Sequence, residues 1–92
     1  MKIIIVGSGK VGFTLAEQLG REQHDVTIVD LREESLRRAS DMLDVMVIHG
    51  NGVSTSTLRE AGADTADLLV AATNSDEVNM VCCLTAKNMG TG

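Results

Sequence analysis

Four short apolar runs punctuate the chain at roughly regular intervals. They occupy residues 3–6, 26–29, 45–48 and 68–72, and most of their members are Ile, Val or Leu. Continuous runs of this length and composition are typical of strands that are buried on both faces of a sheet. The pattern therefore predicts four strands.

The longer stretches between these runs have apolar residues at helical spacing, with charged residues in between. This periodicity predicts amphipathic helices. In the first stretch the apolar positions are Val11, Leu15 and Leu19, and in residues 33–42 they are Leu36, Ala39 and Met42.

Two further helices are predicted from their end signals. Ser54 or Thr55 can cap a short helix that stops at Gly62, and Ser75 can cap the final helix. Asp76 and Glu77 then fall in the first turn of that last helix, where the helix dipole favours acids.

Strict alternation of strands and helices predicts a parallel sheet with helices on both faces. Right-handed crossovers then give a Rossmann-like, doubly wound α/β fold with strand order 3-2-1-4. Residues 1–92 form a single domain with about four βα units, whereas a full Rossmann domain has six strands. We therefore expect an incomplete domain in which the fourth strand has an open edge, either a fragment of a longer chain or a chain completed by another copy.

Composition narrows the classes of partner. The net charge is −5, and the eight basic residues are scattered, so no basic stripe is available to follow a nucleic-acid backbone. No apolar run is long enough to span a bilayer or to form a signal peptide.

Cys82 and Cys83 are adjacent and lack the C-x-x-C spacing of redox sites, so we expect both to pack in the core.

The motif that carries chemistry is GSGKVG, at residues 7–12, between the first strand and the first helix. This is the context that a dinucleotide-binding fingerprint requires. Gly7 permits a tight turn, Gly9 lets a pyrophosphate approach the backbone, and Gly12 lets the helix pack closely on the sheet. Free N–H groups at the start of the helix point at the predicted phosphate position, where the helix dipole also attracts an anion. A Walker A loop is excluded because the residue spacing differs.

Asp30 ends the second strand, 18 residues after Gly12. This is close to the spacing of roughly 20 residues expected for the acid that accepts hydrogen bonds from an adenosine ribose. A carboxylate at this position repels a 2′-phosphate, so NAD(H) is favoured over NADP(H). Arg32 leaves the alternative open, because an arginine there can pair with a 2′-phosphate.

Two more loops follow strands at the edge where ligands bind in such sheets. Asn51, in the loop at residues 49–53, is placed near the adenine, although a simple turn explains it equally well. Thr73, Asn74 and Ser75 follow the fourth strand and face the same cleft, with helix capping as the main role of Ser75.

The sequence predicts neither a metal site nor a catalytic constellation. His24 and His49 are the only histidines, and neither has partners at the spacing of metal ligands. His49 also lacks an evident nucleophile or orienting acid beside it.

The chain closely resembles the RCK (also KTN or TrkA-N) family of regulatory domains from bacterial Trk-type potassium uptake systems. The glycine turn alone is generic to Rossmann domains, so the resemblance depends on longer stretches. These are MKIIIVGSGKVGFTLAEQL, DVTIVD and VIHGNGVSTSTLREAGADTADLLVAATNSDEVNM, which together cover nearly the whole chain.

The resemblance implies a ligand sensor rather than an enzyme. Members of this family bind NAD(H), or adenine nucleotides such as ATP and ADP, and assemble as homo-oligomeric rings on the inner face of a potassium channel or transporter. A cytoplasmic, peripherally membrane-associated protein is therefore expected. The positions that match the family's ligand site are Gly7, Ser8, Gly9, Lys10, Val11, Gly12, Asp30, Asn51, Thr73, Asn74 and Ser75.

Two other interpretations remain open on the residues alone. The same glycine turn and Asp30 would serve the cofactor half of an NAD-dependent dehydrogenase whose substrate domain lies further along the chain. The chain could also be an isolated folding unit that binds no ligand.

Overall fold

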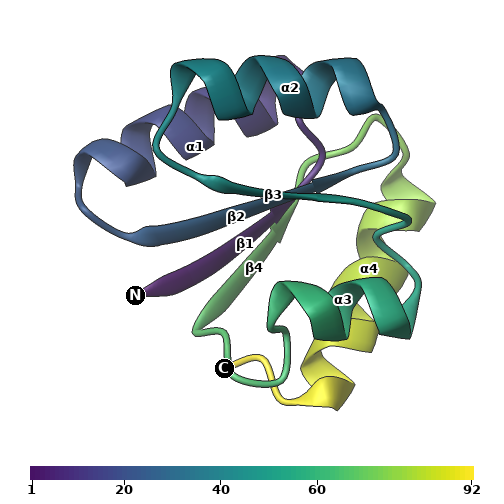
Figure 1. Ribbon diagram of the computed structural model, residues 1–92. Helices are drawn as coiled ribbons and strands as arrows, with labels where there is room; N and C mark the ends of the chain where they lie inside the picture. The colour runs from purple at the N-terminus through teal and green to yellow at the C-terminus, as the bar shows by residue number, and fades with distance from the viewer.

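The computed structural model describes residues 1–92 and contains four strands that alternate with four helices (Figure 1). The strands are β1 (Lys2–Val6), β2 (Asp25–Asp30), β3 (Met46–His49) and β4 (Leu68–Ala71). The helices are α1 (Lys10–Arg21), α2 (Glu33–Met42), α3 (Thr55–Ala61) and α4 (Asp76–Met89). The predicted order of elements is confirmed, and each strand boundary differs from its prediction by at most a single residue.

The strands form one parallel sheet in the order β3-β2-β1-β4, as predicted. Helices α1 and α2 cover one face of this sheet, and α3 and α4 cover the other (Figure 1). The architecture is thus the Rossmann-like, doubly wound arrangement expected from the alternation of elements. β4 pairs only with β1 and ends the sheet, which confirms the expected open edge.

The side chains of β1 divide between two hydrophobic clusters because neighbouring residues of a strand point to opposite faces. Ile3 and Ile5 pack in the cluster beneath α1 and α2, whereas Ile4 and Val6 pack in the cluster beneath α3 and α4. All four are at most 3% exposed. β1 is therefore anchored on both sides, and the turn that follows it starts from a fixed position.

The helical periodicity identified α1 and α2 correctly but misplaced part of their buried faces. Val11 and Met42 were expected to pack in the core, yet each is 63% exposed. The buried residues of α1 are Gly12, Phe13 and Ala16. At Gly12 a Cβ atom would overlap the carbonyl oxygen of Gly7, so α1 approaches the preceding turn too closely for a side chain at that position.

Helix α4 buries one of the two cysteines. Cys82 is fully buried and Cys83 is exposed, so the predicted core packing is confirmed for Cys82 and wrong for Cys83. Burial, together with the neighbouring Cys83, raises the pKa of the Cys82 thiol to about 11. Cys82 therefore behaves as a small core residue rather than as a reactive thiolate.

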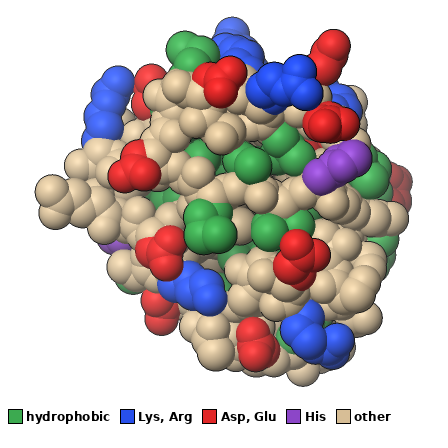
Figure 2. Space-filling view, viewed as in Figure 1, with side chains coloured by type: hydrophobic (Ala, Val, Ile, Leu, Met, Phe, Trp, Pro, Cys, Tyr) green, Lys and Arg blue, Asp and Glu red, His purple; other side chains and the backbone are tan.

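The surface seen in Figure 2 mixes acidic and basic side chains around its rim, with apolar side chains across the middle, where Figure 1 places β3. No continuous basic area is present on this face. None of the helices combines the length and the apolar content that are needed to cross a membrane.

Candidate functional site

The carboxyl ends of the four strands lie side by side at one edge of the sheet. The register pairs Val6 at the end of β1 with Val29 and Ala71, and it pairs Asp30 at the end of β2 with His49. The segments that follow these strands therefore start along the same edge, where open α/β sheets bind ligands. Every residue assigned to the site from the sequence lies in one of these segments or at a strand end or helix start beside them.

The turn after β1 can be made only by glycine. Gly7 has φ +108°, a conformation that L-residues rarely adopt, and its N–H donates to the carbonyl oxygen of Val29 at 2.7 Å. A Cβ atom on Gly7 would lie 2.8 Å from the carbonyl oxygen of Ala72. The turn is therefore held against both the β2 end and the segment that follows β4.

The other two glycines of the motif differ sharply in the space around them. A Cβ atom on Gly12 would overlap the carbonyl oxygen of Gly7 and lie 2.9 Å from its carbonyl carbon, so helix and turn are in direct backbone contact. A Cβ atom on Gly9 would meet only the Nη2 atom of Arg32, at 3.6 Å. Gly12 thus serves the packing of α1, whereas Gly9 leaves backbone open to the surface.

The first turn of α1 keeps its backbone donors outside the helical hydrogen-bond ladder. Gly9 is the N-cap and supplies no side-chain cap, and the N–H of Phe13 donates to the carbonyl oxygen of Gly9 at 2.8 Å. The preceding amides of Lys10, Val11 and Gly12 have no partner within an α-helix. The first turn also contains no acid, so the positive end of the helix dipole is not offset there.

Asp30 lies at the end of β2 and is only 8% exposed. Its Oδ2 atom accepts hydrogen bonds from the backbone N–H of Ser8 at 2.6 Å and from the Ser8 hydroxyl at 2.7 Å. Burial acts to raise the pKa of this carboxyl, but hydrogen bonds from Arg32 and Ser8 outweigh it and lower the pKa to about 2. Asp30 is therefore ionised, and its hydrogen bonds with Ser8 connect the glycine turn to the end of β2.

The remaining contacts of Asp30 come from Arg32. The Arg32 backbone N–H donates to Oδ1 at 2.8 Å, and the guanidinium donates to Oδ1 and Oδ2 at 3.3 Å each. The sequence singled out both residues but treated them as independent partners of a sugar and a phosphate. Their pairing could not be derived from spacing, because residues two apart on an irregular segment have no fixed relative orientation.

Asn51 forms part of a local turn. Its side-chain oxygen accepts a hydrogen bond from the N–H of Val53 at 3.0 Å, and its carbonyl oxygen accepts one from the N–H of Ser54 at 3.0 Å. This is an Asx turn, so the simple-turn interpretation accounts for the Asn51 oxygen. A contact between Asn51 and an adenine remains a prediction.

The segment at residues 73–75, after β4, is held by hydrogen bonds to Asn79, a residue that was not predicted from the sequence. The side-chain oxygen of Asn79 accepts hydrogen bonds from the backbone N–H and the hydroxyl of Thr73, at 3.0 and 2.6 Å. The Asn79 amide nitrogen donates to the Thr73 carbonyl oxygen at 3.1 Å. Ser75 caps α4 by accepting from the N–H of Val78 at 3.2 Å, as predicted. The only available signal for Asn79 was a polar residue between two apolar ones, Val78 and Met80, near the start of the predicted helix.

Replacing Asn79 with leucine should therefore loosen the segment at residues 73–75. Three hydrogen bonds are lost, which predicts a destabilisation of about 2 kcal/mol and faster amide hydrogen exchange in this segment. Hydrogen-exchange NMR measures both. The matched control is Thr91→Val, which removes a side-chain to backbone hydrogen bond to Ala63 at the other end of the sheet. Equal exchange at residues 73–75 in both variants would contradict the assignment.

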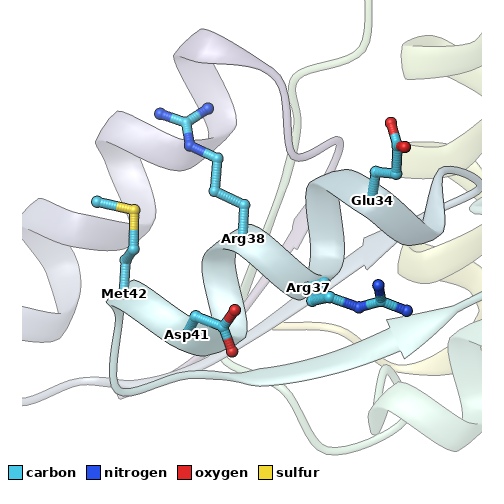
Figure 3. A pocket seen from close by; sticks show the side chains of 5 residues that line it. All are labelled: Glu34, Arg37, Arg38, Asp41 and Met42. Atoms are coloured by element: carbon cyan, nitrogen blue, oxygen red, sulfur yellow. The ribbon is translucent and has the colours of Figure 1, made fainter.

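A hollow of about 310 Å³ lies along α2, away from the glycine turn (Figure 3). Arg38 extends from it toward α1, with its guanidinium carbon 4.4 Å from the centroid of the Phe13 ring. Ligand pockets are mostly apolar with a few polar groups, whereas only one lining residue here is apolar. The hollow is therefore a poor candidate site. Its lining consists of Glu34, Arg37, Arg38, Asp41 and Met42.

Curated relatives match nearly all of this chain. The chain is 48% identical over 89 residues to the Trk system potassium uptake protein TrkA of Halomonas elongata, covering 97% of this chain and 20% of that protein. It is 51% identical over 86 residues to the protein of the same name from Vibrio alginolyticus, covering 94% of this chain and 19% of that protein. The chain thus spans about a fifth of the length of these relatives.

Among solved structures, the NAD(P)-binding domain of an exopolyphosphatase-related protein from Archaeoglobus fulgidus superposes with a TM-score of 0.83. The two chains are 18% identical, and the match covers 97% of this chain and 66% of the other. At this identity the likeness supports the fold alone. The model of the TrkA-N domain family matches residues 3–91. With that match across almost its whole length, the chain belongs to the TrkA-N domain family.

Proposed function

We propose that this chain is a nucleotide-binding regulatory module of a potassium uptake system, and that it binds NAD(H), or ATP and ADP, at the glycine turn. The observation that carries the proposal is the start of α1, where uncapped amides, an open Gly9 backbone and an acid-free first turn coincide. Such a helix terminus is suited to a phosphate group.

The residues at this edge fit the parts of an adenosine diphosphate group. The amides of Lys10, Val11 and Gly12 would hold phosphate oxygens, and the exposed Lys10 side chain adds positive charge. Asp30, one strand away, would accept hydrogen bonds from a ribose, while Asn51 and the segment Thr73, Asn74 and Ser75 would flank the ligand. The start of α4 is less suitable for phosphate, because Ser75 caps it and Asp76 and Glu77 lie in its first turn.

The regulatory part of the proposal is supported by the relatives, which are named Trk system potassium uptake proteins. We infer that residues 1–92 are the N-terminal part of a nucleotide-binding domain in a longer subunit. That subunit would be a cytoplasmic homo-oligomer that lies against the inner face of a membrane potassium transporter. It would act by binding rather than by catalysis.

Coupling would follow from differential affinity. A nucleotide that binds one domain arrangement more tightly shifts the population toward that arrangement, and thereby biases the transporter to which the domain is attached. Couplings of this kind are typically about 1–3 kcal/mol per site, and several sites in an oligomer would add on one gate.

Titration calorimetry of the chain with NADH, NAD, ATP and ADP tests the binding step. We expect each active ligand to bind with one site per chain, and ADP to compete with NADH because both carry the adenosine diphosphate group. Chemical-shift changes in a ¹⁵N spectrum should concentrate at residues 7–12, 30–32 and 73–75.

Absence of binding by all four nucleotides would refute the proposal, and so would shift changes confined to the hollow along α2. A substrate-dependent oxidation of NADH by the longer protein would instead favour the dehydrogenase interpretation.

A further inference from the structure

In the structure, donors from Ser8 and Arg32 occupy every acceptor position of the Asp30 carboxylate. An ionised carboxylate offers about four acceptor positions. Asp30 already accepts five hydrogen bonds, two from Ser8 and three from Arg32, at 2.6 to 3.3 Å. A ribose hydroxyl can therefore bond to Asp30 only if one of these donors leaves.

The donor that can leave is the Arg32 guanidinium. Ser8 is 2% exposed, and its two hydrogen bonds to Asp30 are short. The Arg32 backbone is also fixed by its own N–H bond to Asp30 at 2.8 Å. The guanidinium, in contrast, makes the longest bonds, at 3.3 Å, and the Arg32 side chain is 62% exposed. Only the Asp30 end of this ion pair is buried, so the guanidinium can leave Asp30 for water without crossing packed protein.

The same guanidinium lies over the open glycine of the turn. The Nη2 atom of Arg32 is the sole neighbour of a Cβ atom placed on Gly9, at 3.6 Å. A phosphate approaching the bare backbone at Gly9 would therefore come within reach of the guanidinium. The forked donors of arginine match phosphate oxygens well.

We propose that Arg32 determines ligand selectivity at this cleft by exchanging Asp30 for a phosphate of the bound nucleotide. The inference rests on the proposed function, since it requires a nucleotide at the glycine turn. One side-chain movement then has two effects: it pairs the ligand phosphate, and it frees Asp30 for the sugar. A nucleoside without phosphate offers Arg32 no new partner and is discriminated against.

The phosphate could be the 5′-diphosphate shared by ADP and NADH or the 2′-phosphate of NADPH. Because Arg32 offsets the charge of Asp30, the cleft repels a 2′-phosphate less than a lone Asp30 carboxylate would. Four probes separate these cases: adenosine, ADP, NADH and NADPH.

The experiment compares dissociation constants of these probes by NMR titration of the full chain and of Arg32→Ala. We expect Arg32→Ala to bind the probes whose phosphate pairs with Arg32 about tenfold more weakly than the parent chain does. The same variant should bind adenosine a few-fold more tightly. Arg32→Lys keeps the positive charge but lacks the forked donors of a guanidinium, so its affinities should lie between those of the parent chain and of Arg32→Ala. The matched control is Arg37→Ala, which removes an exposed arginine from α2 that pairs with Glu33.

Each pattern of results has one interpretation. Parallel losses for ADP and NADH assign the partner of Arg32 to the 5′-diphosphate, whereas a loss confined to NADPH assigns it to the 2′-phosphate. Unchanged ratios of every phosphorylated probe to adenosine in Arg32→Ala, with thermal unfolding intact, would overturn the inference while leaving nucleotide binding in place. Failure of the unsubstituted chain to bind any probe would instead remove the proposed function itself.

Discussion

Gly12→Ala is expected to destabilise the chain by about 4 kcal/mol or more, a large part of the 5–15 kcal/mol available to a small domain. The added methyl group would overlap the carbonyl oxygen of Gly7 and lie 2.9 Å from its carbonyl carbon. Neither side can yield easily, because Gly7 is held by its hydrogen bond to Val29 and Gly12 by the packing of α1. Urea unfolding followed by circular dichroism measures the effect.

Gly20→Ala is the matched control, since it makes the same substitution within the same helix. A Cβ atom on Gly20 would have nothing within 4 Å. Alanine is also the better helix former, so this variant should be as stable as the parent chain or up to about 1 kcal/mol more stable. If Gly12→Ala instead unfolded at the same urea concentration as Gly20→Ala, α1 would not pack against the turn as described.

The roles of Gly7 and Gly12 could be predicted from the sequence alone. The spacing of the motif correctly assigned the turn to Gly7 and the close helix packing to Gly12, because each role needs a missing side chain at a fixed point between strand and helix. The strand order also followed from alternation and right-handed crossovers alone. These features depend on the local sequence and on chain direction, both of which are visible without a structure.

Features that depend on side-chain rotation were not predictable in the same way. Val11 fits the apolar periodicity of α1 but is exposed, because the helix faces the sheet with Gly12 and Ala16 instead. The three-way contact between Ser8, Asp30 and Arg32 joins two loops whose separation is set by the sheet. Asn79 accepts hydrogen bonds from Thr73 because the start of α4 lies against the segment that precedes it. In each case the partner is fixed by tertiary geometry rather than by spacing.

Gly9→Val should separate binding from folding. Gly9 has φ −71° and ψ −164°, which is accessible to any L-residue, and only the exposed Arg32 side chain lies near a Cβ atom on it. The loss of a glycine N-cap predicts a stability change within about 1 kcal/mol. The valine side chain, however, would stand where the proposed diphosphate would approach the amides of α1. We therefore expect the affinity for NADH or ADP to fall at least about 100-fold, because the phosphate contacts and their dipole stabilisation are lost together.

A graded series makes this result specific. Gly9→Ala adds a single carbon and should reduce affinity less than Gly9→Val does, whereas Gly20→Ala, on the same helix but far from the turn, should leave affinity unchanged. Calorimetric titration and thermal unfolding on the same samples separate a blocked site from a damaged fold. Binding of NADH to Gly9→Val with the affinity of the parent chain would mean that the phosphates do not lie over the glycine turn. The amides at the start of α1 would then have no part in recognition, and the selectivity assigned to Arg32 would have no ligand phosphate on which to act.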